Sequence, residues 1–280
     1  MSKYFLSIAA CGILLSCGQA RAEMVAAWTF DSDFTADAGG AAFDLTANNG
    51  ATAGESGGKF GNAANFERAN GEFAFTDGNV LTQGGDHSYS AWYKSNVTDI
   101  TGGDRYFVLE TTAGNAPSGD AAWAASYGLR DSGGDIGQVF TRLDNGSSAS
   151  LDIPGGNGNN GDPEWHNIIV TYDGDGGAAA GDGMHTVYLD GSLFGTFDNV
   201  DPLESVEGLV IGGHRAGTGR NFDGSIDDVA FYDHILSTGE VTALQSASAV
   251  PEPNTLALAM VALAGLVNGC RRRTEKRARR

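Results

Sequence analysis

The stretch Glu164-Trp165-His166-Asn167-Ile168-Ile169-Val170-Thr171-Tyr172-Asp173-Gly174 contains the clearest β-strand pattern of the chain. Within it, Ile168, Val170 and Tyr172 fall on one face of an extended backbone, and a mixed set of side chains falls on the other. This alternation predicts a strand with one face in a core. Asp173-Gly174 follows directly and supplies the residue types of a tight turn.

Short segments of the same kind recur along the chain, separated by clusters of Gly, Asn and Asp. One helix is predicted, because Ser237-Thr238-Gly239-Glu240 forms a capping box ahead of residues 241–246. Many short strands with almost no helix indicate an all-β sandwich of two antiparallel sheets. The predicted strands are residues 25–30, 63–66, 72–75, 88–94, 106–110, 126–130, 139–143, 166–172, 185–189, 208–211 and 225–232.

Five segments in a fixed order carry a resemblance to a known family: residues 59–66, 89–94, 164–174, 187–191 and 222–232. Together they resemble the laminin-G-like, concanavalin A-like domains, and the resemblance covers about residues 25–244. It implies a two-sheet antiparallel jelly roll. It says less about the ligand, because lectins, adhesins, enzymes and structural modules all use this jelly roll.

The C-terminal thirty residues form a tail of three parts. Val250-Pro251-Glu252-Pro253 is predicted to be extended, because each proline restricts its own backbone and that of the preceding residue. An apolar run follows at residues 255–269. It is shorter than the roughly 17–25 residues of a full membrane span. The basic residues of 271–280 would stay in the cytoplasm by the positive-inside rule.

This order of elements resembles the PEP-CTERM sorting signal of Gram-negative bacteria. The resemblance implies that an exosortase, an integral membrane peptidase, recognises and cleaves the tail near Pro251, Glu252 and Pro253. The protein would then sit transiently in the inner membrane through its tail helix, and afterwards reach the cell surface, the outer membrane or the extracellular matrix. A plain membrane anchor is the alternative interpretation of the tail.

Residues 1–22 have the features of a secretory signal peptide. Lys3 gives a positive start, residues 4–15 are apolar, and small residues precede a cleavage point between Ala22 and Glu23. The predicted organisation of the chain is therefore a signal peptide, one jelly-roll domain and the sorting tail, at residues 1–22, 23–247 and 248–280.

The three cysteines, Cys11, Cys17 and Cys270, all lie in these terminal segments, so the domain itself forms no disulfide. Cys17 ends the stretch Leu14-Leu15-Ser16-Cys17, which also resembles a lipobox. A lipidated N-terminus at Cys17 is therefore the alternative to cleavage after Ala22.

The charge of the exported part is strongly negative. Residues 23–250 contain 8 Lys and Arg against 33 Asp and Glu, a net charge of −25, whereas the whole chain carries −18. Such a surface repels nucleic acid and anionic lipid. It favours solubility and hard cations such as calcium, which bind oxygen ligands.

The family resemblance also implies one calcium ion near the start and the end of the domain. The expected ligands are Asp31, Asp44 and Asn48 of the N-terminal region, with Asp227 and Asp228 of the last strand. The two adjacent carboxylates are predicted to point to opposite faces of that strand. A carboxylate that points inward requires a partner, a cap or a metal ion.

Two motifs of hydrolytic enzymes are missing from the sequence. It has no Glu-x-Asp-x-x-Glu pair of carboxylates for glycoside hydrolysis and no His-Glu-x-x-His zinc site. Trp123, in an Ala- and Gly-rich stretch expected to be a loop, is the candidate glycan-binding aromatic, although it could instead pack beneath that loop. The expected function is adhesion or binding of a polysaccharide or surface protein. A secreted glycan-active enzyme and a structural matrix component without a small ligand are the alternatives.

Overall fold

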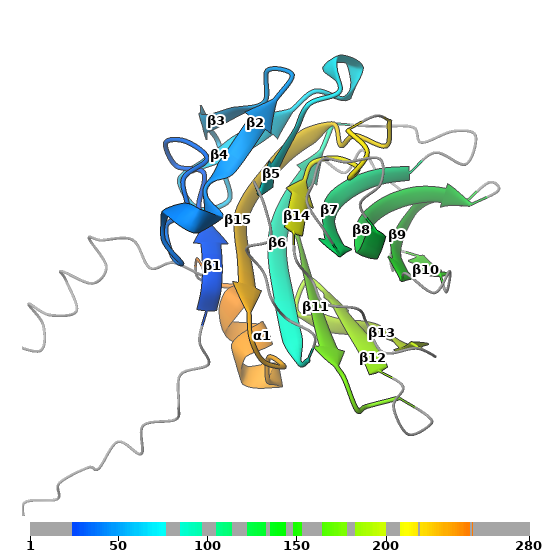
Figure 1. Ribbon diagram of the computed structural model, residues 1–280. Helices are drawn as coiled ribbons and strands as arrows, with labels where there is room; N and C mark the ends of the chain where they lie inside the picture. The colour runs from blue at the N-terminus through cyan, green and yellow to red at the C-terminus, as the bar shows by residue number, and fades with distance from the viewer. Residues whose placement is uncertain are drawn as a thin grey trace, which may run out of the picture.

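Two antiparallel β-sheets pack face to face in the computed structural model (Figure 1), which confirms the predicted jelly-roll sandwich. The segments 1–23 and 249–280 lie outside the described residues, and with them the predicted processing sites at Cys17, Ala22, Glu23 and Pro251–Pro253. The structure describes residues 24–76, 85–96, 105–113, 122–132, 135–143, 148–152, 164–177, 183–199, 208–217, 219–246 and 248.

Sheet A has eight strands, of which β1 pairs only with β15 at its side. All pairings within the sheet are antiparallel, so neighbouring strands run in opposite directions. In spatial order the strands are β13 (Ser192–Asn199), β12 (Gly183–Leu189), β11 (His166–Asp173), β6 (His87–Ser95), β15 (Gly224–Tyr232), β4 (Asn62–Phe66) and β3 (Thr52–Ser56), with β1 (Met24–Trp28) beside β15.

Sheet B has seven strands and is strongly curved at β7, β8 and β9, as Figure 1 shows. Short 3-10 turns at Ala41–Phe43 and Arg68–Asn70 lead into its strands β2 and β5. In spatial order the strands are β10 (Ser148–Asp152), β9 (Asp135–Leu143), β8 (Ala122–Ser132), β7 (Arg105–Ala113), β14 (Gly208–Ile211), β5 (Phe73–Thr76) and β2 (Leu45–Asn48).

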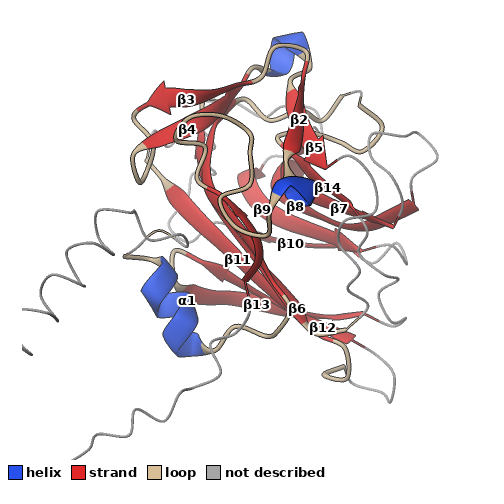
Figure 2. Ribbon diagram, turned by 60° about the vertical axis from the view of Figure 1, so that its left-hand side comes forward, coloured by secondary structure: helices blue, strands red, loops and turns tan. Residues whose placement is uncertain are grey.

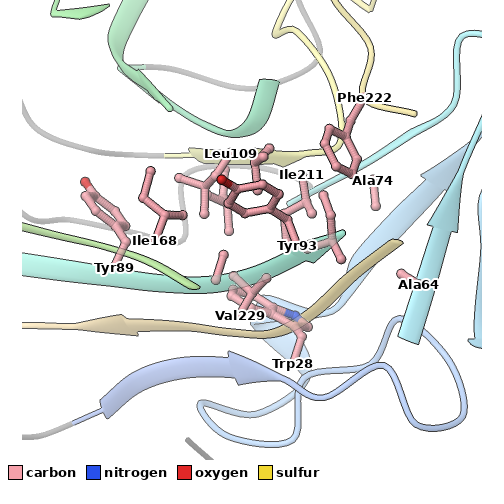
Figure 3. Close-up of a cluster of buried hydrophobic side chains, with 14 of the residues drawn as sticks. Trp28, Ala64, Ala74, Tyr89, Tyr93, Leu109, Ile168, Ile211, Phe222 and Val229 are labelled. Carbon is pink, nitrogen blue, oxygen red and sulfur yellow. The ribbon is translucent and has the colours of Figure 1, made fainter. Parts of the chain in front are cut away.

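The apolar core lies between the two sheets. Figure 3 shows Tyr93 and Val229 of sheet A opposite Leu109 and Ile211 of sheet B. The predicted inner face of β11 is confirmed, because Ile168, Val170 and Tyr172 all belong to this core. Burial of each large apolar side chain stabilises the fold by about 1.5–3 kcal/mol, so the sandwich needs no disulfide.

The outer face of sheet A is covered by the helix α1 (Thr238–Leu244), which Figure 2 shows beside this sheet. The predicted capping box is present, because the Ser237 side chain accepts a hydrogen bond from the Glu240 N–H and the Glu240 carboxylate accepts one from the Ser237 N–H. Val241 of the helix packs with Ile169 and Tyr232 of the sheet. The outer face of β11, which carries a mixed set of side chains, is therefore covered by α1.

No helix in the part of the chain that the structure describes is long and apolar enough to cross a membrane. The apolar run at 255–269 lies outside that part.

Candidate functional site

The two adjacent carboxylates of β15 lie on the same side of sheet A, and the prediction that they point to opposite faces is wrong. The pairing of β15 with β6 is interrupted by a bulge after Asp227, and Asp228 has a left-handed backbone with φ of 49°. An extra residue in a strand displaces the alternation of faces. Ile226 and Val229 therefore face the core on either side of the pair, and neither carboxylate enters the apolar interior.

Asp227 is completely buried beneath the loop of residues 57–62. Its Oδ2 accepts a hydrogen bond from the Phe60 N–H at 2.9 Å, whereas Oδ1 has no hydrogen-bond partner among the described residues. Removal from water raises the pKa of Asp227 to about 7, against the lowering effect of the Phe60 N–H. The same loop closes over Trp92, with the Lys59 ammonium 4.1 Å from the ring centroid.

Asp31 binds the other end of this loop. Its Oδ1 accepts a hydrogen bond from the Asn62 N–H, and the Asn62 side-chain amide donates to the Asp31 carbonyl, both at 2.8 Å. Gly61 has φ of +88°, and a Cβ at this position would lie 2.3 Å from Asp31 Oδ1. Glycine is therefore required here, both for the backbone conformation and for the approach of the carboxylate.

The other three predicted calcium ligands have contacts outside the loop 57–62. Asp44 Oδ1 accepts a hydrogen bond from the Ala36 N–H at 2.9 Å. Asn48 lies in β2, opposite Phe73. Asp228 Oδ1 accepts a hydrogen bond from the Ser248 hydroxyl.

Within the described residues, no three His, Cys, Asp or Glu side chains form a group that could hold a metal ion. Of the five predicted ligands, only Asp31 and Asp227 contact one common segment, the loop 57–62. Calcium prefers six to eight oxygen ligands, so two carboxylates would need several backbone carbonyls beside them. Calcium binding stays a prediction, and the unpartnered Asp227 Oδ1 is the observation in its favour.

A second polar cluster lies on sheet B, and no sequence motif indicates it. Glu110 of β7 is fully buried, yet its carboxylate Oε1 lies 3.2 Å from Arg215 Nη1 and 3.9 Å from His214 Nε2. The Arg215 backbone N–H donates to the other carboxylate oxygen. A glutamate in an apolar strand was visible in the sequence, but its partners follow 105 residues later in the β14–β15 loop.

Arg220 extends this cluster over the end of β7. Its guanidinium lies 5.7 Å from the ring centroid of Phe107, and its Nη1 is 3.2 Å from His214 Nε2. The Arg220 carbonyl accepts a hydrogen bond from the Phe107 N–H at 3.0 Å. Arg220 is exposed and has φ of 56°, an uncommon conformation for a residue with a Cβ.

Trp123 lies in β8 of the same sheet, paired with Thr112 of β7, and not in a loop as predicted. The Ala- and Gly-rich sequence around it suggested a loop because small residues have low strand propensity. Here they form the start of a long strand, where pairing with β7 overrides that propensity.

Two family models match the chain. The one described as the concanavalin A-like lectin/glucanases superfamily matches residues 67–242, and the PEP-CTERM protein-sorting motif matches residues 249–273. No curated protein matches the chain.

Several solved structures share the fold at low identity. Domain 4 of AbnA, a GH43 extracellular arabinanase from Geobacillus stearothermophilus, solved with arabinotriose, is 17% identical, with a TM-score of 0.54 over 80% of this chain and 99% of that one. The binding domain of Paraclostridial Mosquitocidal Protein 1 is 14% identical, with a TM-score of 0.53 over 78% of this chain and 52% of that one. The botulinum neurotoxin type G receptor binding domain is 13% identical, with a TM-score of 0.51 over 80% and 51%.

Proposed function

Because this chain belongs to the concanavalin A-like lectin/glucanases superfamily and carries a PEP-CTERM sorting motif, we propose that it is an exported, non-catalytic glycan-binding protein of the bacterial surface or matrix. An exosortase-type peptidase removes its tail near Pro251-Glu252-Pro253. Its partner outside the cell is a polysaccharide or a glycosylated surface protein.

Binding modules with the same fold support this proposal. The arabinanase domain was solved with a sugar chain, and the neurotoxin and mosquitocidal domains are named as binding domains. A sugar-binding role also agrees with the strongly acidic exported domain, which would not favour nucleic acid as a partner.

The observation that carries the proposal is the difference between the two sheets. The outer side of sheet A is occupied by α1 and by the loop 57–62, which packs on Trp92 through Lys59 and Phe60. Sheet B instead carries Trp123 in β8 and polar side chains on β7. Aromatic rings stack on the apolar faces of sugars, and Trp123 is the residue that we propose for this role, so sheet B is the proposed binding face.

A glycan array with the purified protein tests this function, followed by titration of the best ligand. The variant Trp123→Ala should weaken binding about threefold to tenfold, since stacking on an aromatic ring contributes about 0.5–1.5 kcal/mol. Leu193→Ala, which removes an exposed apolar side chain from sheet A, is the control and should bind like the wild type. If the protein binds no glycan on the array, the proposal is contradicted.

A glycan-active enzyme is the alternative. Among the side chains that the structure describes in the strands of sheet B, Glu110 is a fully buried carboxylate and would have to serve this enzyme. A glycosidase needs two carboxylates about 5–9.5 Å apart, one of them able to hold a proton. Glu110 is instead ion-paired with Arg215. The protein should release no reducing sugar from β-glucans, galactans or sulfated algal polysaccharides, and turnover that Glu110→Gln abolishes would establish the enzyme.

A further inference from the structure

The sorting motif begins directly after the last residue that the structure describes. The motif matches residues 249–273, and the description of the domain ends at Ser248. Ser248 is partly buried, and its hydroxyl donates a hydrogen bond to Asp228 Oδ1 of β15. The chain is therefore held on the domain up to the residue that precedes the motif.

Asp228 is placed to receive this hydroxyl by a local change in β15. The strand pairs with β4 up to Ile226 and with β1 from Val229 onward, so Asp228 lies where one neighbour replaces the other. Its backbone is left-handed, with φ of 49°, and its exposed fraction is 2%. A left-handed residue with a Cβ is costly, and a buried carboxylate requires hydrogen-bond donors. The surrounding structure therefore specifies a buried acceptor at this position.

A second contact holds the chain three residues earlier. The Gln245 side-chain amide donates to Asn167 Oδ1 at 2.5 Å, and Asn167 is a buried residue of β11. In the register of sheet A, Asn167 and Asp227 both pair with Trp92 of β6. The two contacts therefore lie on the strands that flank β6, and the chain leaves the domain over the outer face of sheet A.

The distance from this anchor to the proposed cleavage region is short. Pro251 lies three residues after Ser248. An extended chain spans at most about 3.3–3.6 Å per residue, or about 11 Å for this segment. That length is close to the diameter of one α-helix with its side chains, about 10–12 Å. A peptidase that binds its substrate as an extended strand needs free backbone on both sides of the cleaved bond, so the folded domain obstructs the enzyme while Ser248 is bound.

From this geometry we infer that the contact between Ser248 and Asp228 is a latch that protects the sorting segment, and that the exosortase cleaves the chain after this latch opens. The latch then sets how much of the exported protein presents a cleavable tail at any moment. When opening and closing are fast compared with cleavage, the rate of proteolysis follows the population of the open form. The inference rests on the proposed removal of the tail, and it assigns control of that reaction to the substrate.

Pulse-chase labelling of the full-length protein in the native host tests the latch, with conversion to the shorter form as the readout. Ser248→Ala should accelerate this processing about fivefold to tenfold, because one hydrogen bond shifts the equilibrium between closed and open forms by about that factor. Ser248→Thr keeps the hydroxyl and should be processed at the wild-type rate. Ser246→Ala is the control, since the exposed Ser246 donates its hydroxyl to the Ala243 carbonyl of α1.

A second variant removes the other half of the latch. Asp228→Gly deletes the carboxylate and retains the left-handed backbone, which glycine adopts readily. Alone it should accelerate processing by a similar factor or more. The double variant with Ser248→Ala should be no faster than Asp228→Gly, because both changes remove the same interaction. Melting temperatures of the variants separate an opened latch from an unfolded domain.

Hydrogen exchange measures the opening of the latch in the absence of the peptidase. In the purified full-length protein, the amides of residues 245–250 should exchange about fivefold to tenfold faster in Ser248→Ala than in the wild type, because exchange follows local opening. Ser248→Thr should exchange like the wild type. The amides of β11 and β15 should exchange at the same rate in all three proteins, since the variants leave these strands paired.

Each contrary result has a definite meaning. Equal processing rates of the wild type, Ser248→Ala and Ser246→Ala would overturn the latch and leave the removal of the tail intact. A wild type that keeps its tail throughout the chase would reject the proposed removal, and with it the latch. Slower processing of Ser248→Ala would show that the contact presents the tail to the enzyme, which is the reverse of the inference.

Discussion

His87 and His185 are the two histidines that the fold buries completely. The rings of both pack on Tyr172, with centroids 4.9 and 4.8 Å from its own. Burial lowers the pKa of His87 to about 4, against the opposing effect of Asp86 and the Gly85 carbonyl, and that of His185 to about 3. Both histidines are therefore uncharged near neutral pH while the domain is folded.

Acidification should destabilise the domain through these histidines. Each binds a proton near pH 6.5 in the unfolded chain but not in the folded one, so the free energy of unfolding falls by about 2 kcal/mol per histidine between pH 7 and pH 5. His87→Phe should make the pH dependence, measured by urea unfolding, shallower by about that amount. His234→Phe, at a histidine that is only partly buried, is the control. Asp227, whose raised pKa acts in the opposite direction, is the same in all variants, and an unchanged slope would contradict the prediction.

Asp227 offers a test of calcium at the loop 57–62. A ligand that binds only the folded chain stabilises it by about 2.7 kcal/mol at a hundredfold excess over its dissociation constant. Millimolar calcium should therefore raise the melting temperature, and a chelator should lower it. Asp227→Asn should abolish this response while Asp44→Asn retains it, because Asp44 is occupied by the Ala36 N–H. If the melting temperature of the wild type does not change with calcium, the loop 57–62 is not a calcium site.

Some contacts of single residues could not be predicted from the sequence, because they depend on how the strands pair. The pair Asp227-Asp228 can be recognised in the sequence, but its common side depends on a bulge that only the pairing with β6 establishes. Glu110 and Arg215 can each be found in the sequence. That they form an ion pair depends on topology, since β7 and β14 are neighbours in space although distant in the chain.

At the level of elements, all eleven predicted strands are present, and the four that were not predicted are β2, β3, β10 and β13. These four are the edges of the two sheets. An edge strand buries less of its surface, so its sequence does not need the regular alternation that identifies an inner strand. The Thr52–Ser56 strand, with Gly54 and Glu55, has no buried residue. All inner strands could be predicted from the pattern, whereas of the edge strands only β1, which pairs with β15 alone, could be.

The helix α1 is a short element whose start depends on one side chain. The Ser237 hydroxyl accepts a hydrogen bond from the Glu240 N–H in the capping box. Ser237→Ala should lower the free energy of unfolding by about 1 kcal/mol, as is usual for loss of an N-cap. Thr238→Ala, one position later and exposed, should have a smaller effect. Chemical denaturation of both variants measures the difference, and equal effects would show that the cap does not stabilise the helix.

For the whole molecule, the sorting motif at 249–273 predicts that the mature protein is shorter than the full chain. Protein released from the surface of the native host should end near Val250, as measured by intact mass. Replacement of Pro251, Glu252 and Pro253 by alanine should block this processing and leave the protein in the membrane fraction. Recovery of the chain to Arg280 in the released fraction would show that the tail is an anchor.

The first and last strands of the domain are neighbours. β1 pairs with β15 from Met24 opposite Tyr232 to Trp28 opposite Val229, and α1 is the next element after β15, as Figure 1 shows. Chain ends that lie this close tolerate being joined. A circularly permuted chain that starts at β12 and ends at β11, with a short linker from Ser248 to Met24, would keep every sheet pairing and lose only the hairpin connection. The order of strands along the gene is thus one of several orders that could build the same sandwich.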